Sequence, residues 1–156
     1  MKRPITVATT SLVLQIAMIA LCASIASAQT IQSVETAEAP PPGGHYSQAV
    51  IANGFVFVAG QLPIKLGGRN EIPAGIDAQA RQALSNVDAI LRAANSGLDR
   101  VVSVTVYVTD IANWPEFNRV YADVFGKHRP ARVVAVSPQL HFGSLVEIQA
   151  VALAGK

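Results

Sequence analysis

The sequence predicts an α+β domain in which two helices cover one face of a β-sheet. Runs of alternating apolar and polar residues, typical of strands, flank two segments whose apolar residues recur every three or four positions, typical of helices. Their order is two strands, helix, strand, helix, two strands. A predicted leader of 28 residues leaves 128 of the 156 for folding, which is the size of one domain.

Residues 1–28 are predicted to be a Sec-type secretory signal peptide. Met1-Lys2-Arg3 gives the positive start, residues 11–25 are mostly apolar, and small residues precede a cleavage site after Ala28. The apolar stretch is shorter than the ~20 residues that span a membrane as a helix, so an uncleaved anchor is the weaker alternative. We therefore expect a periplasmic or secreted protein with no stable membrane anchoring after signal cleavage.

Residues 29–44 are polar and contain three consecutive prolines, so we expect a flexible N-terminal segment before a domain over 45–156. Cleavage removes Cys22, the only cysteine, so the mature domain can form no internal disulfide. It also removes Lys2 and Arg3, which leaves 10 basic against 10 acidic residues. A formally neutral chain lacks the basic surface that nucleic-acid binding requires, so no nucleic-acid partner is expected.

The first predicted strands are 49–52 and 55–59. Asn53-Gly54 lies between them and is the strongest short hairpin signal, because both residues tolerate positive φ. A helix is expected over 76–95, where apolar residues share one face. Gly97 is expected to end this helix in the left-handed conformation.

The next strand is predicted over 102–109, where valines alternate with semi-polar residues. The second helix is expected to begin after Asn113 as its cap, with Pro115 in its first turn, and to end at Gly126. Two further strands, about 132–136 and 145–153, complete the sheet.

Two helices cover only one face of such a sheet, and the other face is predicted to carry apolar side chains. These include Tyr107, Leu145, Val151 and Leu153. A second copy of the chain is the expected cover, because most soluble oligomers are symmetric assemblies of one chain. A functional site could then form between subunits.

Arg132 and Glu147 are charged residues inside apolar, strand-like stretches. Burying an ionised side chain costs on the order of several kcal/mol unless it is paired, so both residues need an explanation. They are either functional or form a salt bridge at a subunit interface, and the residue types leave both readings open. An arginine matches a carboxylate in a two-pronged contact, whereas a glutamate can accept and return a proton.

Four stretches together resemble the RidA/YjgF family of imine and enamine deaminases, and their order and spacing match that family from Tyr46 to Leu153. The stretches are His45-Tyr46-Ser47-Gln48-Ala49, Ala59-Gly60-Gln61-Leu62-Pro63, Phe117-Asn118-Arg119-Val120-Tyr121, and Pro130-Ala131-Arg132 with Val146-Glu147-Ile148-Gln149-Ala150.

The resemblance implies a chorismate-mutase-like subunit with a mixed sheet, assembled as a homotrimer with a pocket at each subunit cleft. It also implies hydrolysis of a 2-imino acid or its enamine tautomer to a 2-keto acid and ammonia. Neither a metal nor an organic cofactor would take part. In this reading Arg132 and Glu147 are the catalytic residues: Arg132 holds the substrate carboxylate, and Glu147 activates water and returns a proton to the departing nitrogen.

Tyr46, Gly60, Asn118 and His45 are the further substrate-binding candidates. By analogy Tyr46 lines the pocket, although a tyrosine at the start of a strand can equally be a half-buried packing residue. Asn118 either bonds a neighbouring segment or contacts the pocket of the next subunit. Gly60 allows close approach of backbone or ligand. His45 adds a titratable donor beside Tyr46, or it is simply an exposed loop histidine.

Several positions differ from the commonest pattern of the family. His45 stands for a proline, Ala59 for a serine, Val134 for a cysteine and His141 for a proline. The loss of hydroxyl and thiol groups makes the predicted pocket more apolar. The second reading of the chain is therefore a trimer that binds small carboxylates or a protein without turnover.

Overall fold

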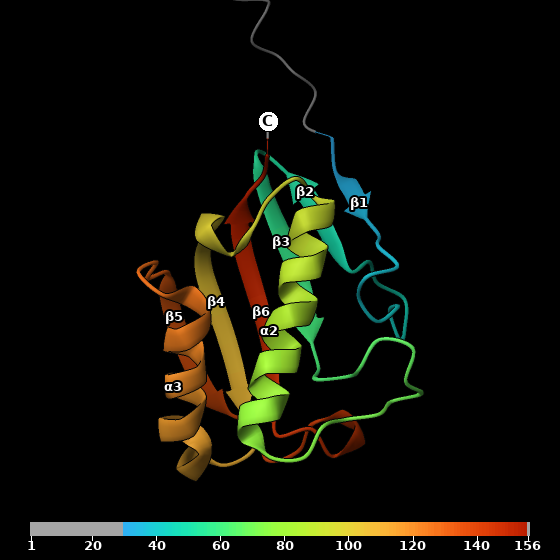
Figure 1. Ribbon diagram of the computed structural model, residues 1–156. Coiled ribbons are helices and arrows are strands. Elements are labelled where there is room, and N and C mark those ends of the chain that lie inside the picture. The colour runs from blue at the N-terminus through green and yellow to red at the C-terminus, as the bar shows by residue number, and fades with distance from the viewer. Residues whose placement is uncertain (1–29, 156) are drawn as a thin grey trace, which may run out of the picture. The chain divides into compact units, whose positions relative to one another are not determined.

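The computed structural model describes residues 30–155, and the predicted signal peptide lies outside the described residues. The chain from Ile31 onward forms one compact unit (Figure 1). Its elements are β1 (Gln32–Val34), β2 (Ala49–Ala52), β3 (Phe55–Gln61), α2 (Ile76–Ala93), η1 (Leu98–Arg100), β4 (Val101–Val108), η2 (Ile111–Asn113), α3 (Trp114–Phe125), β5 (Ala131–Val136), η3 (His141–Gly143) and β6 (Val146–Leu153).

The strands form one six-stranded mixed sheet in the order β1-β2-β3-β6-β4-β5. β4 and β5 are parallel because α3 carries the chain back between them, whereas the other neighbouring pairs are antiparallel. Both helices lie on the same face of the sheet (Figure 1). The predicted α+β class and its two-layer arrangement are confirmed.

The turn between β2 and β3 is the predicted hairpin. Asn53 has φ 52° and Gly54 has φ 78°, so both central residues are left-handed, as the right-handed twist of two short antiparallel strands favours. The pairing of Ala52 with Phe55 closes the hairpin directly around these two residues.

The helix ends confirm some of the expected signals and correct others. Gly126 ends α3 with φ 58° and Pro115 lies in its first turn, as predicted. At the end of α2 the left-handed residue is Asn95, with φ 53°, whereas Gly97 is extended. Asparagine tolerates this conformation, so the predicted stop at Gly97 was wrong by two residues. The side chain of Asn113 makes no cap bond.

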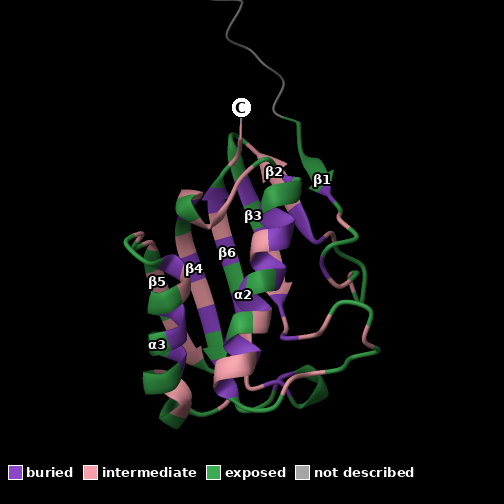
Figure 2. Cartoon of the chain, viewed as in Figure 1, coloured by how far each residue is buried: buried purple, intermediate pink, exposed green. Residues whose placement is uncertain are grey.

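The core lies between the helices and the covered face of the sheet. Alternate residues of β4 and β6 point into it, which gives the banded burial along these strands in Figure 2. Both helices contribute their apolar stripes to the same cluster. Side chains that are almost fully buried there include Val56, Leu84, Ile90, Val104, Val106, Phe117, Val120 and Ile148.

The other face of the sheet exposes several large apolar side chains. Phe57, Tyr107, Val133 and Leu153 are 42%, 37%, 56% and 41% exposed. Leu145, expected on this face, instead packs against the core cluster, because it precedes β6 and leaves the alternation of that strand. Among residues 30–155, no helix has both the length and the apolar character to cross a membrane.

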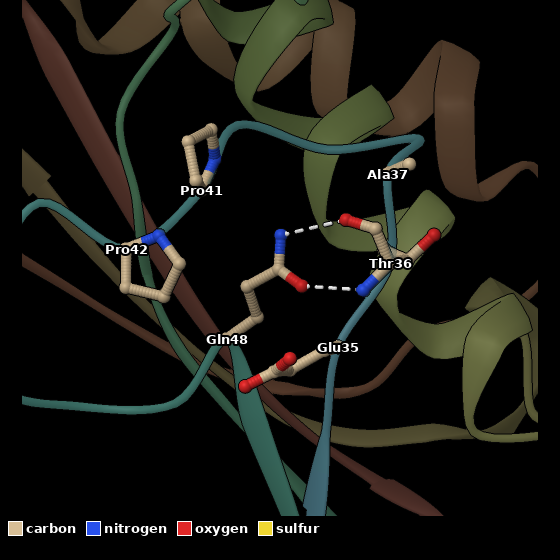
Figure 3. Close-up of a pocket in the computed structure, with 6 residues that line it drawn as sticks. All are labelled: Glu35, Thr36, Ala37, Pro41, Pro42 and Gln48. Carbon is tan, nitrogen blue, oxygen red and sulfur yellow. Dashed lines mark hydrogen bonds between the residues drawn. The ribbon is translucent and has the colours of Figure 1, made fainter.

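Residues 31–44 belong to the same compact unit, which corrects the predicted domain boundary at 45. β1 pairs with β2, and Gln48 fixes the segment that follows β1 (Figure 3). Its amide oxygen accepts a hydrogen bond from the Thr36 amide at 2.7 Å, and its amide nitrogen donates to the Thr36 carbonyl at 3.1 Å and the Pro40 carbonyl at 2.9 Å. The polar, proline-rich composition of this segment did not predict its ordering, because the hydrogen bonds that hold it come from Gln48, which lies outside the segment.

Candidate functional site

Arg132 lies on the edge strand β5, opposite Val104 of β4. Its side chain turns to the helix-covered face and reaches α3. The guanidinium carbon lies 4.2 Å from the centroid of the Tyr121 ring and 4.7 Å from that of the Trp114 ring. Nη2 donates a hydrogen bond to Oδ1 of Asn118 at 2.8 Å. Two aromatic faces and one amide therefore hold the cation in a defined orientation.

The aromatic cradle of Arg132 was not recognised in the sequence as part of a site. Trp114, Asn118 and Tyr121 have the spacing i, i+4, i+7 that defines one helical face. The sequence did contain a signal for this cradle: Asn118 is a polar residue with an aromatic residue on either side of it along one face of the helix. Asn118 is bonded within its own subunit, to the predicted catalytic arginine.

Two polar atoms of this cluster are buried and have no hydrogen-bond partner among the described residues: Nη1 of Arg132 and the hydroxyl of Tyr121. Burial raises the pKa of Tyr121 from 10.0 to about 12, and the nearby positive charge of Arg132 opposes part of that rise. The phenol therefore stays neutral at ordinary pH. An unpaired guanidinium N–H in a buried place favours binding of an anionic oxygen.

Glu147 lies on β6 between Val146 and Ile148, both fully buried under the helices. The alternation of the strand therefore points Glu147 to the open face of the sheet. There it lies against Gly60 of β3, where a Cβ would come within 2.0 Å of its carboxylate oxygen Oε1. The pairing of β3 with β6 shifts register between Val58 and Gln61, which places a glycine at this contact.

Tyr46 and Gly60 both line a cavity of about 450 Å³. Tyr46 is 54% exposed, and its hydroxyl accepts a hydrogen bond from the Gly43 amide at 3.1 Å. His45 is exposed and is not part of the cavity lining. Within residues 30–155, no group of three or more His, Cys, Asp or Glu side chains is arranged to hold a metal ion.

The predicted site residues thus form two groups within one subunit. Arg132 and Asn118 meet on the covered face, beside α3. Gly60 contacts Glu147 on the open face and shares a cavity with Tyr46. The two groups lie on opposite faces of the sheet, so one subunit does not bring the guanidinium and the carboxylate together.

These features define a RidA-like α+β subunit with a fixed arginine and an acid set against a glycine. The sequence profile of the family described as Endoribonuclease L-PSP matches residues 36–154. The chain belongs to this family, which is the RidA/YjgF family.

Relatives and solved structures agree with this assignment. A RutC family protein of Pyrococcus horikoshii is 44% identical over 75% of this chain and 93% of its own length. The 2-iminobutanoate/2-iminopropanoate deaminase of Bos taurus is 38% identical over 77% of this chain and 88% of its own. The crystal structure of TdcF of E. coli, with bound serine, has 34% identity and a TM-score of 0.75, and the match covers 80% of this chain and 99% of that one.

Proposed function

We propose that this protein hydrolyses 2-imino acids, or their enamine tautomers, to 2-keto acids and ammonia. The observation that supports this most directly is Arg132, whose cation is held by aromatic rings and Asn118 while Nη1 remains buried and unpaired. Arg132 as a whole is only half-buried, so a substrate carboxylate can reach the accessible part of this fixed cation. The deaminase name of the bovine relative and the serine bound to TdcF are consistent with a ligand that carries a carboxylate.

In the proposed reaction, Arg132 holds the carboxylate and so fixes the adjacent C=N carbon. Glu147 accepts a proton from water as the water oxygen bonds to that carbon, which gives a carbinolamine. The same carboxyl group returns the proton to nitrogen, and as the C–N bond breaks it takes the carbinolamine hydroxyl proton and passes it to the departing ammonia, which leaves as ammonium. Iminium acid and water thus become 2-keto acid and ammonium, and one carboxyl group serves each proton transfer in turn.

The two groups of site residues require an assembly to meet. We propose a homotrimer in which the Arg132 side of one subunit faces the Glu147 side of the next. The open face, with its exposed Phe57, Tyr107 and Val133, supplies the apolar surface for such contacts. Each cleft would then hold one arginine and one glutamate from different chains.

The activity test generates an imino acid in place with an amino-acid oxidase and measures how fast imine is lost and ammonia released. Arg132→Ala should remove the acceleration over spontaneous hydrolysis. Arg119→Ala is the matched control, because Arg119 follows Asn118 on α3 but belongs to a surface ion-pair network with Asp77 and Asp123. Equal rates for wild type and Arg132→Ala would contradict the anchoring role.

Subunit mixing tests whether the site is shared. Arg132→Ala and Glu147→Gln proteins should each retain only a small residual activity, because every cleft lacks one group. Unfolded together and refolded as mixed trimers, they should regain part of the wild-type rate, since one cleft in each mixed trimer joins an intact Arg132 to an intact Glu147. No recovery from verified mixed trimers would contradict a shared site.

The same experiments address the second reading, a trimer that binds carboxylates without turnover. That reading predicts thermal stabilisation by 2-keto acids, lost in Arg132→Ala, with ammonia released no faster than by spontaneous hydrolysis. Binding together with accelerated release supports the enzyme.

We also propose that the protein is exported, on the evidence of residues 1–28 in the sequence. Mass spectrometry of the protein from extracytoplasmic fractions should find a mature chain that begins at Gln29. A full-length chain retained with the cytosolic fraction would contradict export.

A further inference from the structure

The cavity beside the proposed site is larger than a three- or four-carbon acid needs. Its volume is about 450 Å³, within the range of pockets that enclose much larger ligands. Tyr46 and Gly60 belong to its lining, and Gly60 contacts Glu147, so the cavity adjoins the proposed reaction centre. The loop after β3 and the segment before β6 reach the same end of the sheet (Figure 1).

The walls of this cavity are mainly apolar. Pro41, Leu62 and Ile64 contribute to them, together with the rings of Tyr46 and Phe142. Apolar walls with a few polar groups at one end are typical of pockets that take a hydrophobic side chain and orient it from its polar end.

Phe142 is the most unusual member of the lining. It has φ 60° and ψ 19°, a left-handed conformation that bulky residues rarely adopt, and its side chain is 55% exposed. Neither burial in the core nor backbone preference accounts for a phenylalanine here. A ligand that covers the ring would account for it, because a residue held in a rare conformation is frequently part of a binding site.

The charged residues that line the cavity do not strongly favour a substrate with an acidic side chain. Lys65 is paired with Glu71 on the same loop, so these two charges cancel. Arg69 is the remaining cation of the lining, and it is exposed. Solvent screening makes an exposed charge a weak determinant compared with several apolar side chains.

We infer that the preferred substrate is a 2-imino acid with a bulky apolar or aromatic side chain, which the cavity takes against Phe142 while the imino acid end faces Glu147. This inference rests on the proposed function and specifies its substrate class.

The test compares imines made in place from phenylalanine, leucine and alanine, and in parallel the binding of phenylpyruvate and pyruvate by calorimetry. The wild type should have a higher kcat/KM for the bulky imines and should bind phenylpyruvate more tightly. Phe142→Gly should lower the ratio of bulky to small kcat/KM about tenfold, since loss of a hydrophobic contact of this size commonly costs that much or more. Glycine suits the left-handed backbone, so folding should be preserved.

Leu66→Ala is the matched control, because Leu66 is also an apolar residue, 52% exposed, and lies between the lining residues Lys65 and Gly67 without being part of the lining. Turnover of the alanine-derived imine without any preference for bulky ones would overturn the inference and leave the proposed function intact. Tighter binding of phenylpyruvate that depends on Phe142, without turnover of any imine, would support the cavity's specificity and overturn the proposed catalysis. A preference for dicarboxylic imines, lost in Arg69→Ala, would also overturn the inference.

Discussion

Gly60 and Glu147 are in direct contact across β3 and β6, and a Cβ at position 60 would lie 2.0 Å from the carboxylate oxygen Oε1. No side chain fits there unless the glutamate moves. The contact therefore ties the position of the proposed acid to the absence of a side chain on the neighbouring strand.

The first prediction concerns this contact. Gly60→Ala should displace the flexible carboxylate while the fold persists, so kcat/KM should fall by roughly a hundredfold with a small change in Tm. In a Glu147→Gln background, Gly60→Ala should lower kcat/KM only slightly further, because the carboxylate that it would displace is already absent. Steady-state rates of the single and double variants check this. Additive losses would mean that Gly60 acts independently of Glu147.

The second prediction concerns the hydroxyl of Tyr121, which is buried without a partner. Tyr121→Phe removes no hydrogen bond of the described subunit, so the free energy of unfolding should change by less than about 1 kcal/mol. Tyr121→Ala also removes the ring that stacks on Phe125 and should cost about 3–5 kcal/mol. Denaturant titration of both variants is the measurement. A large loss in Tyr121→Phe would reveal a partner supplied by assembly.

The third prediction is the alkaline behaviour of the same residue. Its pKa is raised to about 12 in the folded protein by burial, whereas it is 10.0 in the unfolded chain. The folded state therefore holds the phenolic proton more tightly, and the resulting stabilisation is complete below pH 10 and is lost as pH rises toward 12. Wild type should lose stability across this window more steeply than Tyr121→Phe in thermal unfolding. Identical slopes would refute the raised pKa.

The fourth prediction concerns the N-terminal segment held by Gln48. Gln48→Met keeps the approximate size of the side chain but leaves the Thr36 amide and several carbonyls without partners, which should cost about 1–3 kcal/mol per unsatisfied buried group. Proteolysis within 35–44 should accelerate. Gln139→Met is the control, because Gln139 is exposed. Equal protease resistance of the two variants would mean that other contacts hold the segment.

The fifth prediction concerns assembly. Wild type should sediment with the mass of three subunits, whereas Val133→Glu places a charge on the open face and should give monomers without deaminase activity. Ile31→Glu is the control, since Ile31 is 77% exposed just before the edge strand β1. An active Val133→Glu monomer would contradict the shared site.

Much of the fold was predictable because its signals are local. Asn53-Gly54, Pro115 and Gly126 each act through their own backbone preferences, and each is found where the sequence predicted it. β1 was missed because a three-residue edge strand has too few positions to show alternation. The stop at Asn95 was missed because glycine is the commoner left-handed residue, and one stood two positions later.

The site was predictable in its residues and less so in its geometry. Arg132 and Glu147 were conspicuous because charge interrupts apolar strands. Their separation onto opposite faces depends on which alternate residues of β5 and β6 point toward the core. The placement of Trp114 and Tyr121 around Arg132 depends on the parallel pairing of β5 with β4. These relationships are set by the sheet as a whole, so no short motif contains them.

The opposite orientations of Arg132 and Glu147 mean that a lone chain holds two halves of a reaction centre that cannot act on one molecule. Under the proposed function, the rate per chain is then proportional to the fraction of chains that are assembled into trimers. In very dilute solution the abundance of trimer rises with the third power of subunit concentration, so the rate per chain should rise with its square. Dilution would therefore lower the activity of each chain without any inhibitor.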